Sequence, residues 1–72
     1  MKILGIDPGL TQTGYGIIQS VNDNIEMIDY GVIAVPKKKS LNIRLYTIFF
    51  DICEIIRKYK PQIFVIEEVF FW

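Results

Sequence analysis

A long amphipathic segment between two short apolar runs is the feature that most restricts the fold. Residues 41–59 place apolar side chains at spacings of four and three, the pattern of a helix that covers one side of a core. The positions on this stripe are Leu41, Leu45, Ile48, Ile52, Ile55, Ile56 and Tyr59. The runs 3–7 and 63–66 have the length and the aliphatic content of buried strands. Because the helix is long enough for a crossover, we expect strand 63–66 to lie parallel to a strand already in the sheet.

Local signals define both ends of this helix. Ser40 follows a loop of Pro36 and three lysines, and it stands where a helix N-cap belongs. Pro61 ends the helix, because the residue before a proline is pushed out of the α region. The opposite side of the predicted helix carries Arg44, Thr47, Asp51, Glu54 and Lys58. On that side we expect Glu54 and Lys58 to form a favourable pair one turn apart.

The first half of the chain predicts one strand followed by an antiparallel hairpin. Strand 3–7 ends at Pro8, which has no N–H, and at Gly9, which permits a positive φ. The next strands are 13–20 and 25–35, and the short Asn22-Asp23-Asn24 turn between them makes the pair antiparallel. The element order is therefore β-β-β-α-β, an α/β arrangement. Placing the fourth strand beside the first leaves the hairpin on the other side.

Composition excludes several classes of protein. The 72 residues include 8 Lys and Arg, 8 Asp and Glu and no His, so the net charge is zero, whereas a free-standing electrostatic DNA or membrane binder carries a basic excess. A chain that is 51% hydrophobic is too apolar to be disordered. One cysteine, Cys53, excludes an internal disulfide. With no apolar run of ~20 residues and no signal peptide ahead of Asp7, we expect a soluble cytoplasmic protein.

The last three residues, Phe70, Phe71 and Trp72, are all aromatic. Domains usually finish with polar, frayed residues, because a terminus has little to bury it. We therefore expect the chain to be part of a larger domain or to dock on a partner.

Two carboxylates stand at the ends of the two predicted parallel strands. Asp7 ends strand 3–7 and Glu67 follows strand 63–66 with the same parity, so we expect both to emerge together at the carboxyl edge of the sheet. Ligands and active sites collect at that edge. Two close carboxylates repel unless they share a proton or bind a cation, and the all-oxygen set favours a hard ion such as Mg²⁺. Glu68 points to the other face or lies past the strand, so it ranks below Glu67.

Each of these residues also has a purely structural interpretation. Asp7 before Pro-Gly is a common turn residue, and a Glu-Glu pair at a strand end is commonly a solvated terminus. Lysines 37–39 can contact phosphate, although such a loop more often only adds solubility. Phe70 can stack on an unpaired base, although an aromatic residue after a buried strand usually belongs to a core. The glycines form neither a Rossmann nor a Walker spacing.

Three motifs in a fixed order carry a resemblance to a known family. They are G-I-D-P-G at 5–9, T-G-Y-G at 13–16 and I-E-E-V-F at 66–70. With the helical segment 41–61 between them, they resemble the amino-terminal half of the RuvC crossover-junction (Holliday junction) endodeoxyribonucleases, over all 72 residues. The resemblance implies a ribonuclease H-like fold with a mixed sheet, truncated here before the family's fifth strand and later helices.

The resemblance also implies a function. It implies a metal-dependent endonuclease that uses two Mg²⁺ ions and resolves four-way DNA junctions by paired symmetric nicks in recombination and repair. Asp7 would be the metal ligand on the first strand and Glu67 the ligand on the fourth, both catalytic, while Phe70 matches an aromatic residue that engages DNA bases. The implied partners are four-way junction DNA, a second copy in a homodimer, and the branch-migration helicase complex, with no membrane.

The sequence departs from the family pattern by absence. Family members continue with a pair of aspartates one helical turn apart that completes the metal site, and with later basic segments that bind DNA. We therefore expect residues 1–72 to be an incomplete nuclease domain that is inactive alone.

Two alternatives stay open. One is a fragment of an actin-like or sugar-kinase-type ATP-binding fold, whose first hairpin also begins Gly-x-Asp-x-Gly and would bring Gly9 and Thr11 near phosphates. The other is a non-enzymatic remnant whose aromatic end docks on a partner.

Overall fold

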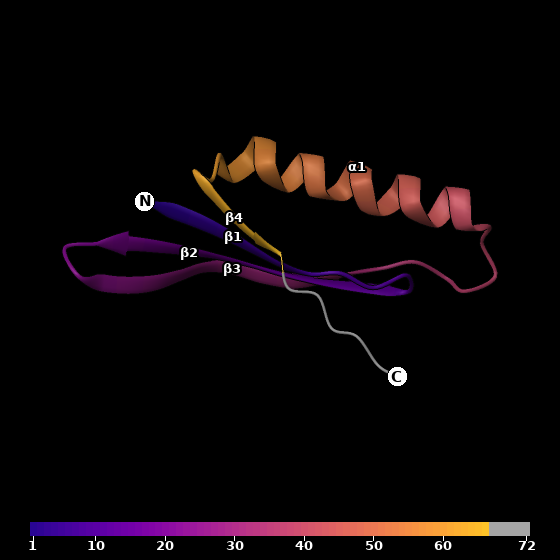
Figure 1. Cartoon of the computed structure of the whole chain (residues 1–72), viewed down its shortest axis with the longest axis horizontal. Helices are drawn as coiled ribbons and strands as arrows, with labels where there is room; N and C mark the ends of the chain where they lie inside the picture. The colour runs from indigo at the N-terminus through magenta and orange to yellow at the C-terminus, as the bar shows by residue number, and fades with distance from the viewer. Residues whose placement is uncertain (67–72) are drawn as a thin grey trace.

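The computed structural model describes residues 1–66 and consists of a four-stranded sheet with one helix along one of its faces (Figure 1). The elements in chain order are β1 (Lys2–Asp7), β2 (Gln12–Val21), β3 (Asn24–Ala34), α1 (Leu41–Tyr59) and β4 (Ile63–Ile66). This order confirms the predicted β-β-β-α-β arrangement.

The sheet is mixed, with the strand order β3-β2-β1-β4. Strand β1 pairs antiparallel with β2 and parallel with β4, and in the parallel pair Gly5 lies beside Val65 and Ile6 beside Ile66. The crossover through α1 therefore returns the chain to the free side of β1, as predicted from the length of the helix.

A tight turn connects β2 and β3. Asn22 and Asp23 both adopt left-handed backbone conformations, with φ values of 49° and 67°. Two successive left-handed residues give the turn a twist that matches the twist of the paired strands, and Asn and Asp tolerate this conformation best after glycine. The predicted antiparallel hairpin is confirmed.

Both predicted ends of α1 are confirmed. The Ser40 hydroxyl accepts a hydrogen bond of 3.3 Å from the Ile43 N–H, as an N-cap does. At the other end Lys60 adopts a left-handed conformation with φ of 50°, and its N–H donates to the Ile56 carbonyl at 2.8 Å. Pro61 then prevents any continuation of the helix.

The burial expected for the side chains of α1 is wrong in part. Leu41 and Leu45 are 48% and 49% exposed, whereas Arg44 and Asp51, which were assigned to the solvent side, are half-buried. The stripe is not unique because the helix also carries apolar residues outside it. These are Ile43, Tyr46, Phe49 and Phe50, and all four are exposed. Periodicity therefore predicts the side of α1 that faces the sheet, where Leu45 and Ile48 line a cavity with Thr13, but it does not predict how deeply each side chain is buried.

The predicted ion pair on the helix forms with a different partner. Glu54 contacts Arg57 at 2.7 Å, three residues away, while the Lys58 ammonium lies 5.2 Å from the centre of the Tyr59 ring. Both spacings bring side chains together on a helix surface, and an exposed pair of this kind contributes little to stability.

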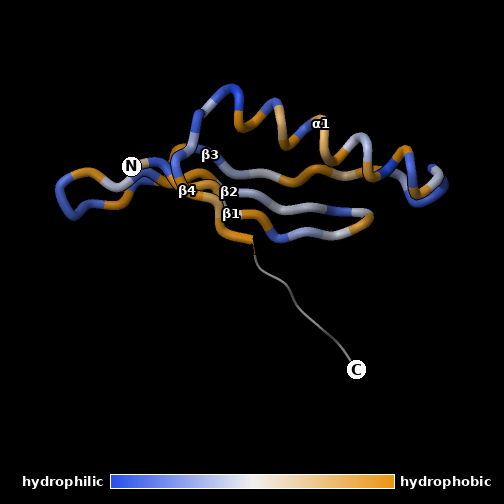
Figure 2. The backbone as a smooth tube through the Cα atoms, turned by 45° about the horizontal axis from the view of Figure 1, so that its top comes forward, coloured by the Kyte–Doolittle hydropathy of each residue, from blue (hydrophilic) through white to orange (hydrophobic). Residues whose placement is uncertain are grey.

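The core is small and lies on the side of the sheet that faces α1. Leu4 and Ile17 are cross-strand partners with 1% and 0% exposure, and Ile33 and Val35 extend the cluster along β3 and the segment after it. The predicted burial of 63–66 is wrong, because β4 lies at the edge of the sheet beyond the cover of α1 and all four of its side chains are exposed. Figure 2 shows the hydrophobic character of this exposed strand.

Helix α1 does not combine the length and the apolar character of a membrane-spanning helix.

Candidate functional site

Asp7 is the last residue of the central strand β1, and its side chain is exposed. It lies opposite Gly14 of β2. On the other side of β1 the described register ends with Ile66 beside Ile6, the residues that precede Glu67 and Asp7 in the sequence. The parallel neighbours required by the carboxylate prediction are therefore present. Glu67 itself lies outside the described residues, so its meeting with Asp7 stays a prediction.

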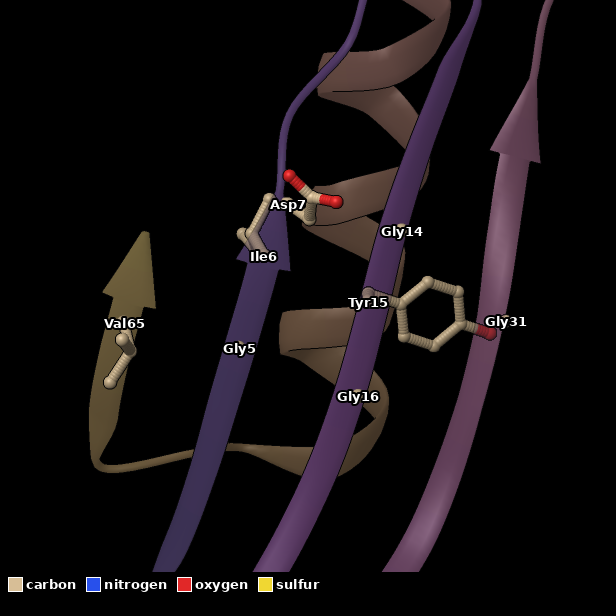
Figure 3. A pocket seen from close by; sticks show the side chains of 8 residues that line it. All are labelled: Gly5, Ile6, Asp7, Gly14, Tyr15, Gly16, Gly31 and Val65. Carbon is tan, nitrogen blue, oxygen red and sulfur yellow. The ribbon is translucent and has the colours of Figure 1, made fainter. Parts of the chain in front are cut away.

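A shallow depression of about 360 Å³ lies beside Asp7 on the face of the sheet opposite α1 (Figure 3). Side chains alternate along a strand, so Leu4 faces the helix while Gly5 and Asp7 face the depression. Its lining residues are Gly5, Ile6, Asp7, Gly14, Tyr15, Gly16, Gly31 and Val65. The carboxylate thus stands at the rim of a surface that is largely free of side chains.

Three of the four glycines that line this surface are not required by packing among residues 1–66, whereas a Cβ atom on Gly31 would lie 2.9 Å from the Tyr15 hydroxyl oxygen. A Cβ atom on Gly16 would meet nothing within 4 Å, and one on Gly5 or Gly14 would make only ordinary contacts of 3.9 and 3.8 Å. Glycine within a strand weakens it, because it loses more backbone entropy on folding and has no side chain to pack. Their combined effect here is to leave access to the Asp7 carboxylate open.

The loop after Asp7 is held from inside by a residue that the sequence reasoning missed. Thr13 is 1% exposed, and its hydroxyl accepts a bond of 3.2 Å from the Gly9 N–H and donates one of 2.9 Å to the Gly9 carbonyl. The sequence did contain a signal for this residue. Thr13 shares the helix-facing side of β2 with Tyr15 and Ile17, because side chains alternate along a strand. A buried hydroxyl there needs hydrogen-bond partners.

The predicted exit of the chain from the sheet at Pro8-Gly9 is confirmed, because β1 ends at Asp7, but Gly9 does not use the positive φ that glycine permits. None of the glycines among residues 1–66 has a positive φ. Gly9 is required because a Cβ atom would collide with the Gln12 carbonyl oxygen across the loop. Space, rather than left-handed backbone geometry, therefore selects glycine after Pro8.

A second polar contact joins the end of α1 to β3. The Tyr59 hydroxyl donates a bond of 2.6 Å to Asp29 Oδ2, and the Tyr30 N–H donates one of 2.8 Å to Asp29 Oδ1. The Tyr59 bond is the main cause that lowers the pKa of Asp29, and the same bond raises the pKa of Tyr59. This pair is distinct from the Asp7 surface, and its role is to fix the helix on the sheet.

The donor chemistry at Asp7 fits a hard cation. Within residues 1–66 the salt bridge that forms joins Arg57 to Glu54. No basic side chain in that part of the chain therefore neutralises the Asp7 carboxylate. The same residues contain no group of three or more potential metal ligands. Asp7 is therefore one exposed carboxylate of the predicted metal site. The other predicted ligand, Glu67, and the predicted DNA contact, Phe70, lie outside the described residues.

Comparison with protein families gives a match over almost the whole chain. The family model described as "Crossover junction endodeoxyribonuclease RuvC" matches residues 3–72. Relatives with that description include one from Prochlorococcus marinus (strain MIT 9312), 47% identical over 72 residues, and one from Syntrophomonas wolfei, 41% identical over 71 residues. These alignments cover 100% and 99% of this chain but 46% and 41% of the relatives. The chain thus spans about half the length of the curated relatives it matches.

Solved structures confirm the predicted ribonuclease H-like fold. Thermus thermophilus RuvC matches with a TM-score of 0.91 and 24% identity, covering all of this chain and 45% of that one. A T. thermophilus RuvC in complex with a Holliday junction substrate matches with a TM-score of 0.90 and 23% identity, covering all of this chain and 46% of that one. A more distant match is the Aquifex aeolicus PPX-GPPA enzyme, with a TM-score of 0.71 and 14% identity over 92% of this chain and 25% of that one.

Proposed function

Because the chain belongs to the RuvC family of crossover junction endodeoxyribonucleases, we propose that it is the amino-terminal half of a nuclease domain that cuts four-way DNA junctions in recombination and repair. The observation that carries this proposal is the family match over residues 3–72, with Asp7 exposed at the end of the central strand. A relative of the same family has a structure in complex with a Holliday junction substrate.

The proposed role of Asp7 and Glu67 is to hold divalent metal ions, with Mg²⁺ as the preferred ion. Carboxylate oxygens suit this hard cation, and the Asp7 carboxylate is exposed and without a cationic partner within residues 1–66. Bound ions of this kind activate a water molecule and stabilise the leaving oxygen in phosphodiester hydrolysis. Asp7 contributes negative charge, oxygen donors and a fixed position next to an open surface.

The proposed partners follow from the substrate. Four-way junction DNA offers two equivalent strands, so paired nicks require a second copy of the chain, and a branch-migration helicase would deliver the junction. Phe70 is the proposed residue for stacking on a base. The proposed location of the activity is the cytoplasm, because the relatives that this chain matches are bacterial proteins described as DNA endonucleases. The net charge of zero gives residues 1–72 little electrostatic affinity for phosphates, so the DNA-binding surface would come mainly from the rest of the domain.

The family match favours this function over an ATP-binding fragment. The structural likeness to the PPX-GPPA enzyme shows a shared fold, whereas the relatives at 41–47% identity are described as junction endonucleases. A non-enzymatic remnant stays an alternative, and the following experiment separates it from the nuclease.

The test is a chimera in which this chain replaces the matching part of the Prochlorococcus marinus relative. We expect the chimera to nick a synthetic four-way junction when Mg²⁺ is present and to lose this activity with Asp7→Asn. The matched control is Asp23→Asn, which changes the same chemical group in the hairpin turn and keeps a residue that tolerates its φ of 67°. A folded chimera that leaves the junction intact would contradict the proposed function.

A further inference from the structure

In the loop that follows Asp7, both backbone polar groups of Gly9 form their hydrogen bonds with one hydroxyl. Residues 8–11 connect β1 to β2, and Pro8 has no N–H to donate. Thr13 Oγ1 satisfies both polar groups of Gly9, accepting from its N–H at 3.2 Å and donating to its carbonyl at 2.9 Å. Backbone groups that are withdrawn from water need such partners, so the hydroxyl acts as a clamp across the loop.

Packing of the loop against α1 does not replace the two hydrogen bonds between Thr13 and Gly9. A cavity of about 290 Å³ lies under the loop, between Pro8, Gly9 and Thr13 on one side and Leu45 and Ile48 of α1 on the other. The underside of the loop is therefore not filled by helix side chains. The outer end of the loop is tied elsewhere, because the Val35 N–H donates to the Thr11 carbonyl at 3.0 Å.

Asp7 is directly attached to this loop and has no cationic partner within residues 1–66. The direction of its carboxylate therefore depends on the backbone of residues 7–9. In this segment Pro8 has a fixed φ, and Gly9 follows it. We propose that Thr13 is a positioning residue for Asp7, holding the 7–9 turn so that the carboxylate stays aimed at its ligand. This inference rests on the proposed function of Asp7 as a metal ligand.

Two substitutions separate the hydroxyl from the shape of the side chain. Thr13→Val keeps the branched shape and removes the hydrogen bonds, whereas Thr13→Ser keeps the hydroxyl and removes a methyl group. Ile33→Val is the matched control, because Ile33 is the buried cross-strand partner of Thr13 and the substitution also removes one carbon from the core. Mn²⁺ serves as the probe, since its bound position is read from paramagnetic broadening of the Asp7 and Gly14 amide signals.

The expected result is a loss of Mn²⁺ affinity that follows the hydroxyl. Removal of a residue that orients a metal ligand typically lowers metal affinity about tenfold or more, so we expect a loss of this size in Thr13→Val. In Thr13→Ser and Ile33→Val the Mn²⁺ affinity should stay within about twofold of that of the unmodified chain. Hydrogen exchange at the Gly9 amide gives a second measurement without metal, and its protection should fall in Thr13→Val only. If Thr13→Val does not fold, Thr13→Cys replaces it, because it places a weak donor at the same position. This variant should show an intermediate loss of Mn²⁺ affinity and of protection at the Gly9 amide.

Two results would overturn the inference in distinguishable ways. In the first, Mn²⁺ binds at Asp7, but Thr13→Val leaves its affinity unchanged or Ile33→Val weakens it equally. This result would contradict the positioning role of Thr13 and leave the metal role of Asp7 intact. If neither the unmodified chain nor the chimera with the Prochlorococcus marinus relative shows broadening near Asp7 that Asp7→Asn removes, the proposed metal site and the positioning role are contradicted together.

Discussion

The hydroxyl of Tyr59, in the last turn of α1, donates a 2.6 Å hydrogen bond to the carboxylate of Asp29, in the middle of β3. The two residues are thirty positions apart in the sequence, and their contact fixes the end of the helix from which the chain enters β4. The hydrogen bond therefore holds the end of α1 that leads into β4 against β3.

The first prediction concerns the pH dependence of this contact. The pKa of Asp29 lies below its usual value of 3.8 because Tyr59 donates to the charged form, and the pKa of Tyr59 lies above 10.0 for the same reason. The Asp29 contribution to stability is present above its unfolded pKa and is lost as the pH falls through the folded pKa. The Tyr59 contribution is present below its unfolded pKa and is lost as the pH rises through the folded pKa.

Tyr59→Phe should therefore lower the melting temperature most between these two limits, near neutral pH. The difference from the unmodified chain should shrink in acid, where Asp29 is protonated, and in alkali above the raised pKa of Tyr59. Thermal melts of both chains across the pH range provide the measurement. A constant difference at every pH would show that lost packing, and not the hydrogen bond, explains the effect.

The second prediction concerns glycine positions on either side of Asp7. Gly9→Ala should destabilise the chain by about 1–3 kcal/mol, because the new methyl group collides with the Gln12 carbonyl oxygen. Gly16→Ala is the matched control, since its methyl group meets nothing within 4 Å, and it should stabilise the strand by roughly 0.5–1 kcal/mol. Urea denaturation midpoints of the two variants would move in opposite directions, and equal shifts would contradict the loop geometry.

The third prediction concerns the small core. Ile17 is 0% exposed, so Ile17→Ala should cost about 2–5 kcal/mol and remove much of the stability of a chain of this size. Ile25→Ala makes the same chemical change at a side chain that is 72% exposed, and it should cost far less. Circular dichroism during urea denaturation would measure both. Similar losses in the two variants would indicate that the helix does not pack over Ile17 in solution.

The fourth prediction concerns activity. We expect residues 1–72 alone to leave a four-way junction intact in the presence of Mg²⁺, because Asp7 and Glu67 are two ligands of a larger proposed set. The measurement is a gel assay of labelled junction strands at increasing chain concentration, with EDTA as the metal-free control. Cleavage that depends on Mg²⁺ and disappears in Asp7→Asn would show that two carboxylates are sufficient.

Local patterns predicted most of the fold. The turn at Asn22-Asp23, the cap at Ser40 and the stop at Pro61 depend on neighbouring residues alone, and each is confirmed. The parallel pairing of β4 with β1 followed from the length of the helix between them, and it is also confirmed.

Features that depend on distant surfaces were not predictable in the same way. The burial of α1 side chains was not predictable for Arg44, which is half-buried although it lies off the apolar stripe, or for Leu45, which is 49% exposed although it lines a cavity with Thr13. The contact of Tyr59 with Asp29 has no local signal. At the candidate site Asp7 was identified from its position at a strand end, whereas Thr13 was missed because its hydroxyl acts on a loop that sequence periodicity does not describe.

The exposed edge strand has a consequence for the behaviour of the chain in solution. Within residues 1–66, β4 presents unpaired backbone groups along its outer side, together with side chains that are 39–66% exposed. Such an edge is a template for another strand, and the four apolar residues of β4 include no charge or proline that would block pairing. If strand addition between molecules occurs at this edge, it should increase with protein concentration and compete with the isolated fold.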